Sequence, residues 1–141
     1  MLVASSMGAT AFQRGLGAMH ALSHPLGALY DAHHGLLNAI VMPYVLTANL
    51  TAIETVLADA ARALDLADHS AKGFIDWVLG MRAQLAIPHT LGEIGINGAE
   101  AERVGAMAAA DSTAPGNPIA FSAAQYTQLF RNALSGELAA V

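Results

Sequence analysis

Apolar positions recur along much of this chain at spacings of three and four residues, the pattern that gives an α-helix one apolar face. The clearest case is the segment Thr51–Leu64, whose apolar face holds Ile53, Val56, Leu57, Ala60 and Leu64. Asn49 or Thr51 is the expected N-cap of this helix, and Glu54 follows Thr51 at the spacing of a capping box. The segment Ser70–Leu85 shows the same pattern, with Phe74, Trp77, Val78 and Met81 on one face.

Two earlier segments are apolar on nearly every side. Residues 5–21 are small and apolar, and we expect one closely packed helix there, because each interior glycine costs up to about 1 kcal/mol relative to alanine and needs compensation. Gly35–Ala48 is almost continuously apolar, which indicates a helix buried on most sides. Between them, Pro25 predicts a kink or break near Ser23 and His24.

Two further helices are predicted near the end of the chain, at Ala99–Ala110 and Ser122–Leu134. The sequence DSTAPGNPIAF separates them, and its prolines and glycine oppose regular structure. No segment alternates apolar and polar residues with the period of a β-strand. The pattern therefore predicts an all-α fold, organised as a single helical domain over residues 1–141.

The composition narrows the class of protein. Hydrophobic residues make up 55% of the chain and charged residues only 12%, against roughly 25% charged in an average soluble domain. A membrane-spanning helix needs about 20 predominantly apolar residues, whereas the longest apolar run, Leu36–Leu46, is interrupted by Asn38 and Pro43. The first residues lack the basic region of a signal peptide. We therefore expect a cytoplasmic protein, outside the membrane, that buries an unusually large apolar surface.

Charge and residue content exclude several kinds of site. The formal net charge is -5 and the six Lys and Arg residues are scattered, which argues against nucleic acid as a partner because phosphate binding needs clustered cations. The absence of cysteine excludes disulfides, thiolate metal ligands and a cysteine nucleophile. No glycine-rich turn joins a strand to a helix, so the chain lacks a dinucleotide-binding fingerprint.

Four of the six histidines lie between Met19 and Asn38. His20 and His24 are four residues apart, which places them on one face of a continuous helix, and a turn after Pro25 could bring His34 back to them. The His-x3-His spacing is by itself a weak signal for a metal site, and two imidazoles leave a metal ion short of ligands. The alternative is that these histidines are core or cap residues, and the spacing alone leaves both interpretations open.

The stretch GLGAMHALSHPLGALYDAHHGLLNAIVMPYVLTAN, residues 15–49, closely resembles the signature of the iron-containing (group III) alcohol dehydrogenases. In that family it reads approximately G-x-x-H-x-x-x-H-x-x-G, then a turn, then H-G-x-x-N-A-x-x-x-P-x-V. The fixed histidines, glycines, asparagine and proline are all present. The rest of the chain is also similar to the C-terminal half of that family, in order and without gaps.

The resemblance implies a role for each histidine of the motif. His20 and His34 match the two metal ligands, for Fe²⁺ or Zn²⁺, and His24 matches the histidine to which proton-relay or substrate-positioning roles are assigned. His33 has no implied chemistry. The implied reaction is reversible hydride transfer between a primary alcohol or aldehyde and NAD(P), with the metal polarising the substrate oxygen.

The resemblance also implies parts that this chain does not contain. In the family an Asp-x3-His pair upstream supplies two more metal ligands, and an N-terminal domain binds the nucleotide. We therefore expect this chain to be the C-terminal metal-binding half, inactive alone, whose partners are the N-terminal half and a small alcohol or aldehyde. The N-terminal half would cover part of the apolar surface. A homo-oligomer, with a second copy of the chain as partner, is compatible with the sequence.

Two other functions are compatible with the sequence. One is a non-catalytic helical module that uses its apolar faces to oligomerise, which gives no reason for the spacing of His20, His24 and His34. The other is a related reductase of the same superfamily, such as a maleylacetate reductase. GLLNAIVMPYVL fits the alcohol dehydrogenase branch better.

Overall fold

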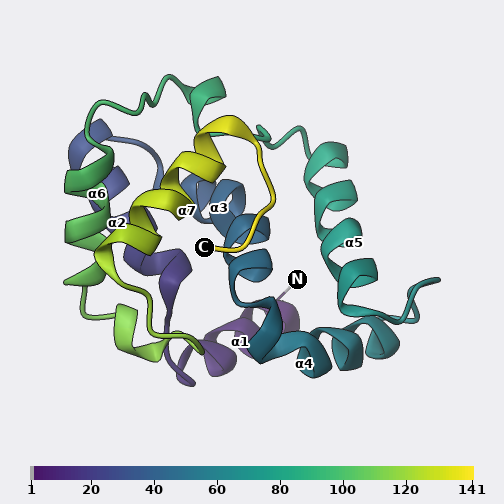
Figure 1. Ribbon diagram of the computed structural model, residues 1–141. Helices are drawn as coiled ribbons and strands as arrows, with labels where there is room; N and C mark the ends of the chain where they lie inside the picture. Colours follow the sequence, from purple (N-terminus) through teal and green to yellow (C-terminus); the bar gives the residue numbers. More distant parts are fainter. Residues whose placement is uncertain (1) are drawn as a thin grey trace.

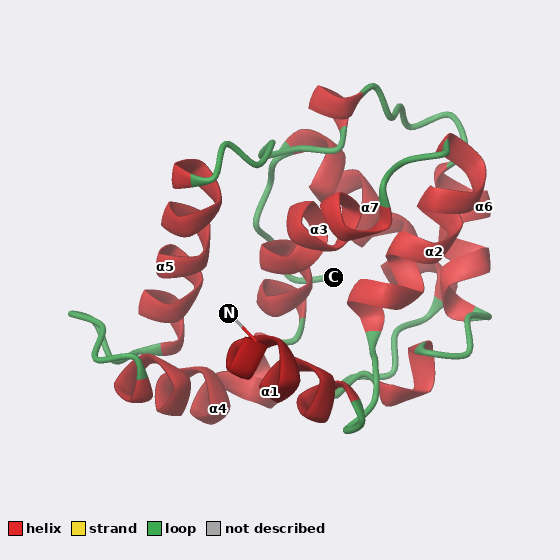
Figure 2. Cartoon of the chain, turned by 180° about the vertical axis from the view of Figure 1, so that it is seen from behind, coloured by secondary structure: helices red, strands yellow, loops and turns green. Residues whose placement is uncertain are grey.

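The computed structural model describes residues 2–141, and this part of the chain forms α-helices and two short 3-10 helices with no β-strand (Figure 2). The α-helices are α1 (Leu2–Phe12), α2 (Ala18–Tyr30), α3 (His34–Ala48), α4 (Leu50–Ala63), α5 (Ala71–Gln84), α6 (Ala101–Ala109) and α7 (Ala123–Ser135). The 3-10 helices are η1 (Gly92–Ile94) and η2 (Ala114–Gly116). The predicted all-α fold is confirmed.

The main core lies between α2, α3, α6 and α7, which pack side by side (Figure 1). Its largest fully buried side chains include Tyr44, Tyr126 and Phe130. Helices α6 and α7 approach closely at Gly105, where a Cβ atom would lie 2.0 Å from the Thr127 hydroxyl oxygen. A glycine is therefore required at this crossing.

Helices α4 and α5 form a smaller cluster at one side of the molecule (Figure 1). Leu57, Ala71 and Ile75 are buried between them, and α5 also contacts α3. Within residues 2–141 no single helix is long and apolar enough to cross a membrane. Only α3 and α4 taken together pass such a test, and a bend of 112° separates them.

The predicted continuous helix over residues 5–21 is wrong. Helix α1 ends at Phe12 and α2 begins at Ala18, because Gly15 adopts a φ of 105° and Gly17 is extended. Close packing of this segment is wrong as well. No residue of α1 is buried, and a Cβ at Gly8 would meet nothing within 4 Å.

Of the kink or break predicted at Pro25, the break is wrong, because α2 runs through this proline to Tyr30. Leu22 and Leu26 are fully buried on either side of it. Burying each leucine contributes about 1.5–3 kcal/mol, which offsets the backbone hydrogen bond that proline removes. The continuous helix keeps His20 and His24 one turn apart.

Helix α4 begins at Leu50, and its N-cap is Asn49, the first of the two predicted cap residues. No side chain caps the helix, so the predicted Thr51–Glu54 capping box is wrong. Of the predicted apolar face only Leu57 is buried, while Val56 is 64% exposed and Leu64 49% exposed. The sequence pattern identified an apolar face that the described residues cover only in part.

Candidate functional site

The fold brings His20, His24 and His34 together. His20 and His24 lie on one face of α2, and His34 is the first residue of α3. A tight turn connects the two helices, with Asp31 in the left-handed conformation at a φ of 52°. The ring centroids of His20 and His34 are 5.3 Å apart, those of His24 and His34 5.4 Å, and those of His20 and His24 5.9 Å.

The Nε2 atoms of His20 and His34 point toward a common position. The amide nitrogen of Asn38, one turn further along α3, lies 2.9 Å from Nε2 of His34 and 3.5 Å from Nε2 of His20. The other amide atom, Oδ1 of Asn38, is buried and has no hydrogen-bond partner among the described residues. Two ring nitrogens and one amide therefore meet at one point.

Ser23 favours one tautomer of His34. The buried Ser23 hydroxyl donates to the carbonyl of His20 at 3.2 Å, and its oxygen lies 3.4 Å from Nδ1 of His34. Because the Ser23 hydroxyl proton is donated to His20, the Ser23 oxygen can only accept from His34. A proton on Nδ1 of His34 meets this requirement. The lone pair of His34 is then on Nε2, the atom that faces Asn38.

Burial lowers the pKa of His20 below its ordinary value of 6.5, and the neighbouring charges of His34 and His24, when protonated, lower it further. The carboxylate of Asp111 opposes this shift. His20 is thus favoured as a neutral imidazole, the form that binds metal ions.

The chemistry of the side chains at this point suits a divalent transition metal, with part of the ligand set supplied. Imidazole nitrogen binds Fe²⁺ and Zn²⁺, and the Nε2 atoms of His20 and His34 both face the position of the Asn38 amide nitrogen. Among residues 2–141, no three His, Cys, Asp or Glu side chains are arranged to hold a metal ion. His20 and His34 therefore fit such an ion only if other ligands complete its coordination.

Asp111 is a member of this cluster that the sequence analysis missed. Its Oδ2 atom lies 2.9 Å from Nδ1 of His24, across 87 positions of sequence. Asp111 follows α6 at the start of the segment predicted to be irregular, where an aspartate reads as an ordinary turn residue. No local spacing connects it to α2, so only the tertiary fold reveals the pair.

The remaining histidines have structural surroundings. His33 is the N-cap of α3, and its Nδ1 atom accepts a hydrogen bond from the backbone N–H of Leu36 at 3.3 Å. The carbonyl of His89 accepts a hydrogen bond of 2.7 Å from the hydroxyl of Tyr44. His69 is exposed in the segment before α5.

Asn117 fixes the beginning of α2, and with it His20. Its Oδ1 atom accepts the backbone N–H of Ala18 at 3.1 Å, which satisfies one of the free donors at the helix N-terminus. Gly17 permits this contact, since a Cβ there would lie 3.0 Å from the same oxygen. Phe12, at the end of α1, packs edge-on against the His20 ring at a centroid distance of 6.0 Å.

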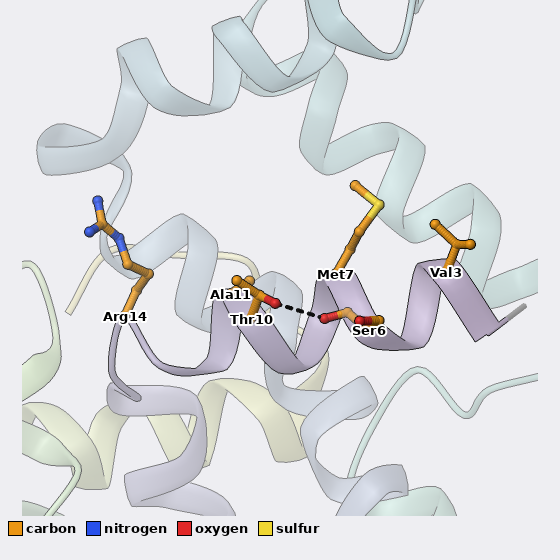
Figure 3. A pocket seen from close by; sticks show the side chains of 6 residues that line it. All are labelled: Val3, Ser6, Met7, Thr10, Ala11 and Arg14. Atoms are coloured by element: carbon orange, nitrogen blue, oxygen red, sulfur yellow. Dashed lines mark hydrogen bonds between the residues drawn. The ribbon is translucent and has the colours of Figure 1, made fainter.

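A largely apolar hollow of about 570 Å³ lies beside His20. It extends from the segment 15–17 to α3 and α4, and Met42, Val45 and Ile53 are among its lining residues. A second hollow, of about 580 Å³, lies along α1, and it is lined by Val3 and Met7 of this helix and by Arg14 of the turn that follows (Figure 3). Both hollows are open to the surface.

Comparison with known proteins places the chain in one family. The model of the C-terminal region of the Fe-containing alcohol dehydrogenase family matches residues 1–134. The chain is 38% identical to 4-hydroxybutyrate dehydrogenase of Cupriavidus necator over 95% of its length and 37% of the relative's. It is 33% identical to 1,3-propanediol dehydrogenase of Citrobacter freundii, over 94% of this chain and 36% of that one.

Solved structures show the same fold. A 1,3-propanediol oxidoreductase superposes with a TM-score of 0.80 at 30% identity, covering 84% of this chain and 33% of that one. An iron-containing alcohol dehydrogenase from Thermococcus thioreducens gives a TM-score of 0.77 at 29% identity, covering 86% and 32%. The chain thus spans a little over a third of the length of the curated relatives named above.

Proposed function

The chain belongs to the iron-containing alcohol dehydrogenase family, and we propose that it is the metal- and substrate-binding helical domain of an NAD(P)-dependent alcohol dehydrogenase. The observation that carries the proposal is the convergence of the His20 and His34 Nε2 atoms, at 3.5 and 2.9 Å from the Asn38 amide nitrogen. Two imidazole nitrogens directed at one position are an arrangement that a divalent metal ion can use. We therefore assign His20 and His34 as ligands of Fe²⁺ or Zn²⁺.

His24 is the proposed proton acceptor. When bound, the metal supplies Lewis acidity, which lowers the pKa of a coordinated hydroxyl group. His24 is 40% exposed, its ring stacks on His34 at an interplanar angle of 18°, and its Nε2 atom has no hydrogen bond within residues 2–141. This nitrogen is the one available to take the hydroxyl proton as the alcohol loses hydride to the nicotinamide.

The nucleotide site and the remaining metal ligands belong, in this proposal, to a polypeptide region outside the present chain. Two facts support this division. The relatives are nearly three times as long as the region matched here, and residues 2–141 contain no complete set of metal ligands. The exposed apolar residues of α1, including Leu2, Val3 and Met7, are the surface we expect that region to cover.

The proposed substrates are small primary alcohols and the corresponding aldehydes. The apolar hollow beside His20 suits a short carbon chain whose oxygen lies near the imidazoles. Two relatives are named for 4-hydroxybutyrate and 1,3-propanediol. Each of these compounds has a second polar group at the far end of a short carbon chain. These two compounds are the first substrates to assay.

A chimera tests the proposal directly. The matching third of the Cupriavidus necator 4-hydroxybutyrate dehydrogenase is replaced by this chain, and NAD reduction is measured after loading with Fe²⁺ or Zn²⁺. We expect activity that His20→Ala or His34→Ala abolishes, and none from the isolated chain. A folded, metal-loaded chimera without activity would contradict the proposal, as would robust turnover by the chain alone.

A non-catalytic oligomerisation module is the second candidate, favoured by the exposure of Val56 and Leu64 on α4. Such a module needs no metal. Sedimentation of the purified chain as a stable oligomer, without metal after preparation in the absence of chelators, would favour this function over the first.

A further inference from the structure

The carboxylate of Asp111 is held in place by two donors of its own loop. Its Oδ1 atom accepts the backbone N–H of Thr113 at 2.8 Å and the Thr113 hydroxyl at 2.6 Å. These bonds occupy one carboxylate oxygen and leave Oδ2 directed at His24, 2.9 Å from Nδ1. The Asp111 side chain is 16% exposed, whereas that of His24 is 40% exposed, so the carboxylate is the more enclosed partner of the contact.

Asp111 is held in its ionised form. Its burial acts to raise the pKa, but the hydrogen bonds from Thr113 and the contact with His24 outweigh burial and leave the pKa of Asp111 below its ordinary value. An ionised carboxylate only accepts hydrogen bonds. The atom facing it, Nδ1 of His24, must therefore carry a proton.

This contact determines which nitrogen of His24 is free. A neutral imidazole with a proton on Nδ1 has its lone pair on Nε2, at the opposite edge of the ring. Stacking on His34 at 5.4 Å limits the tilt of the ring, and the bond to Asp111 limits its rotation in that plane. The lone pair is thus fixed in type and in direction.

We infer that Asp111 is a positioning residue that holds His24 as the Nδ1–H tautomer, so that Nε2 is the atom presented to the hydroxyl proton of the substrate. The catalytic part of this inference rests on the proposed function, whereas the tautomer does not. The pair also links α2 to the segment after α6, and a purely structural link would tolerate any neutral hydrogen-bonding partner at position 111.

The tautomer is measured by long-range ¹H–¹⁵N NMR on the full chain, without added metal, at about pH 8, where an ordinary imidazole is neutral. We expect a pyrrole-type nitrogen at Nδ1 of His24 and a pyridine-type nitrogen at Nε2. In Asp111→Asn the amide can donate to Nδ1 as well as accept from it, so the Nε2–H tautomer should appear. Asp111→Glu should restore the wild-type pattern, and Asp68→Asn, in an exposed loop before α5, serves as the control.

An Nε2–H tautomer in the wild-type chain would overturn the inference, and this result is readable even if Asp111→Asn fails to fold. The same tautomer ratio in the wild type and a folded Asp111→Asn variant would overturn it as well. Neither result depends on metal binding. Failure of the proposed function, seen as loss of the metal-ligand role of His20 and His34, is therefore distinguishable from failure of this inference.

Discussion

Asn49 and Asn117 form a reciprocal pair of amide hydrogen bonds across 68 positions of sequence. Nδ2 of Asn49 donates to Oδ1 of Asn117 at 3.1 Å, and Nδ2 of Asn117 donates to Oδ1 of Asn49 at 2.7 Å. The same two side chains bind the carbonyls of Val45 and Ile119 and the N–H of Ala18. One pair thus joins the bend between α3 and α4 to the beginning of α2, two residues before His20.

Removing one member of this pair should destabilise the fold. Asn49 is 2% exposed, and Asn49→Ala removes its two hydrogen bonds with Asn117 and its side-chain bond to the Val45 carbonyl, at a cost of about 1–3 kcal/mol. Urea unfolding followed by circular dichroism measures this, with Gln84→Ala on the exposed end of α5 as the control. Equal unfolding free energies for the two variants would show that the pair contributes nothing.

Gly105 and Gly80 make a matched pair of helical glycines. A Cβ at Gly105 would meet the Thr127 hydroxyl at 2.0 Å, whereas a Cβ at Gly80 in α5 would meet nothing within 4 Å. We expect Gly105→Ala to cost about 1–3 kcal/mol through overpacking between α6 and α7. Gly80→Ala should stabilise the protein by about 0.5–1 kcal/mol through helix propensity. Thermal unfolding measures the stability of both variants, and we expect Gly105→Ala to unfold at a lower and Gly80→Ala at a higher temperature than the wild type. A stabilising effect of Gly105→Ala would contradict the close helix crossing.

Tyr126 is fully buried, yet its hydroxyl has no hydrogen-bond partner among the described residues. Burial, and then the charge of Asp111, raise the pKa of Tyr126 to about 12. We expect Tyr126→Phe to leave stability unchanged or raise it by up to about 1 kcal/mol, because it removes an unpaired polar group at nearly constant shape. If Tyr126→Phe instead lowers the unfolding free energy measured in urea by more than about 1 kcal/mol, this prediction is contradicted, and a bridging water bound by the hydroxyl is indicated.

The pKa of Glu93 lies below its ordinary value of 4.5, because the backbone N–H of Thr90 and then the Thr90 hydroxyl donate to its carboxylate. A carboxyl group whose pKa is lower in the folded than in the unfolded state stabilises the fold above the unfolded pKa. That contribution is lost as pH falls through the folded pKa. As pH falls below the ordinary glutamate pKa of 4.5, the unfolding free energy of Glu93→Gln should therefore depend less on pH than that of the wild type. Parallel pH profiles for the two proteins would contradict this.

The sequence predicts the helices well where one side of each helix faces a core that the same chain supplies. Ser122 caps α7 through a capping box with Gln125, and the predicted Ser122–Leu134 differs from α7 by one residue at each end. The predicted start of this helix agrees with the observed one because the capping box that fixes it lies within one helical turn. At residues 5–21 the apolar pattern gave no indication that the helix ends at Phe12, since Gly15 and Gly17 are also tolerated inside helices.

The candidate site also has one part that the sequence predicts and one part that only the tertiary fold shows. The spacing of His20 and His24 is local, and the family resemblance implied roles for both and for His34. The partners of these rings lie on other elements or arise from packing. Asp111 meets His24 only because α6 lies beside α2, and neither residue type nor spacing identifies such a contact in advance.

The most direct test of the central claim is calorimetric titration of the purified chain with Zn²⁺ at neutral pH, comparing the wild type with His20→Ala, His34→Ala and the control His69→Ala. His69 is exposed and lies outside the imidazole cluster. We predict one weak site that His69→Ala leaves intact and that each of the other two variants weakens at least about tenfold, since each removes one of two imidazole ligands. Indistinguishable titration curves for the wild type, His20→Ala and His34→Ala would contradict the account.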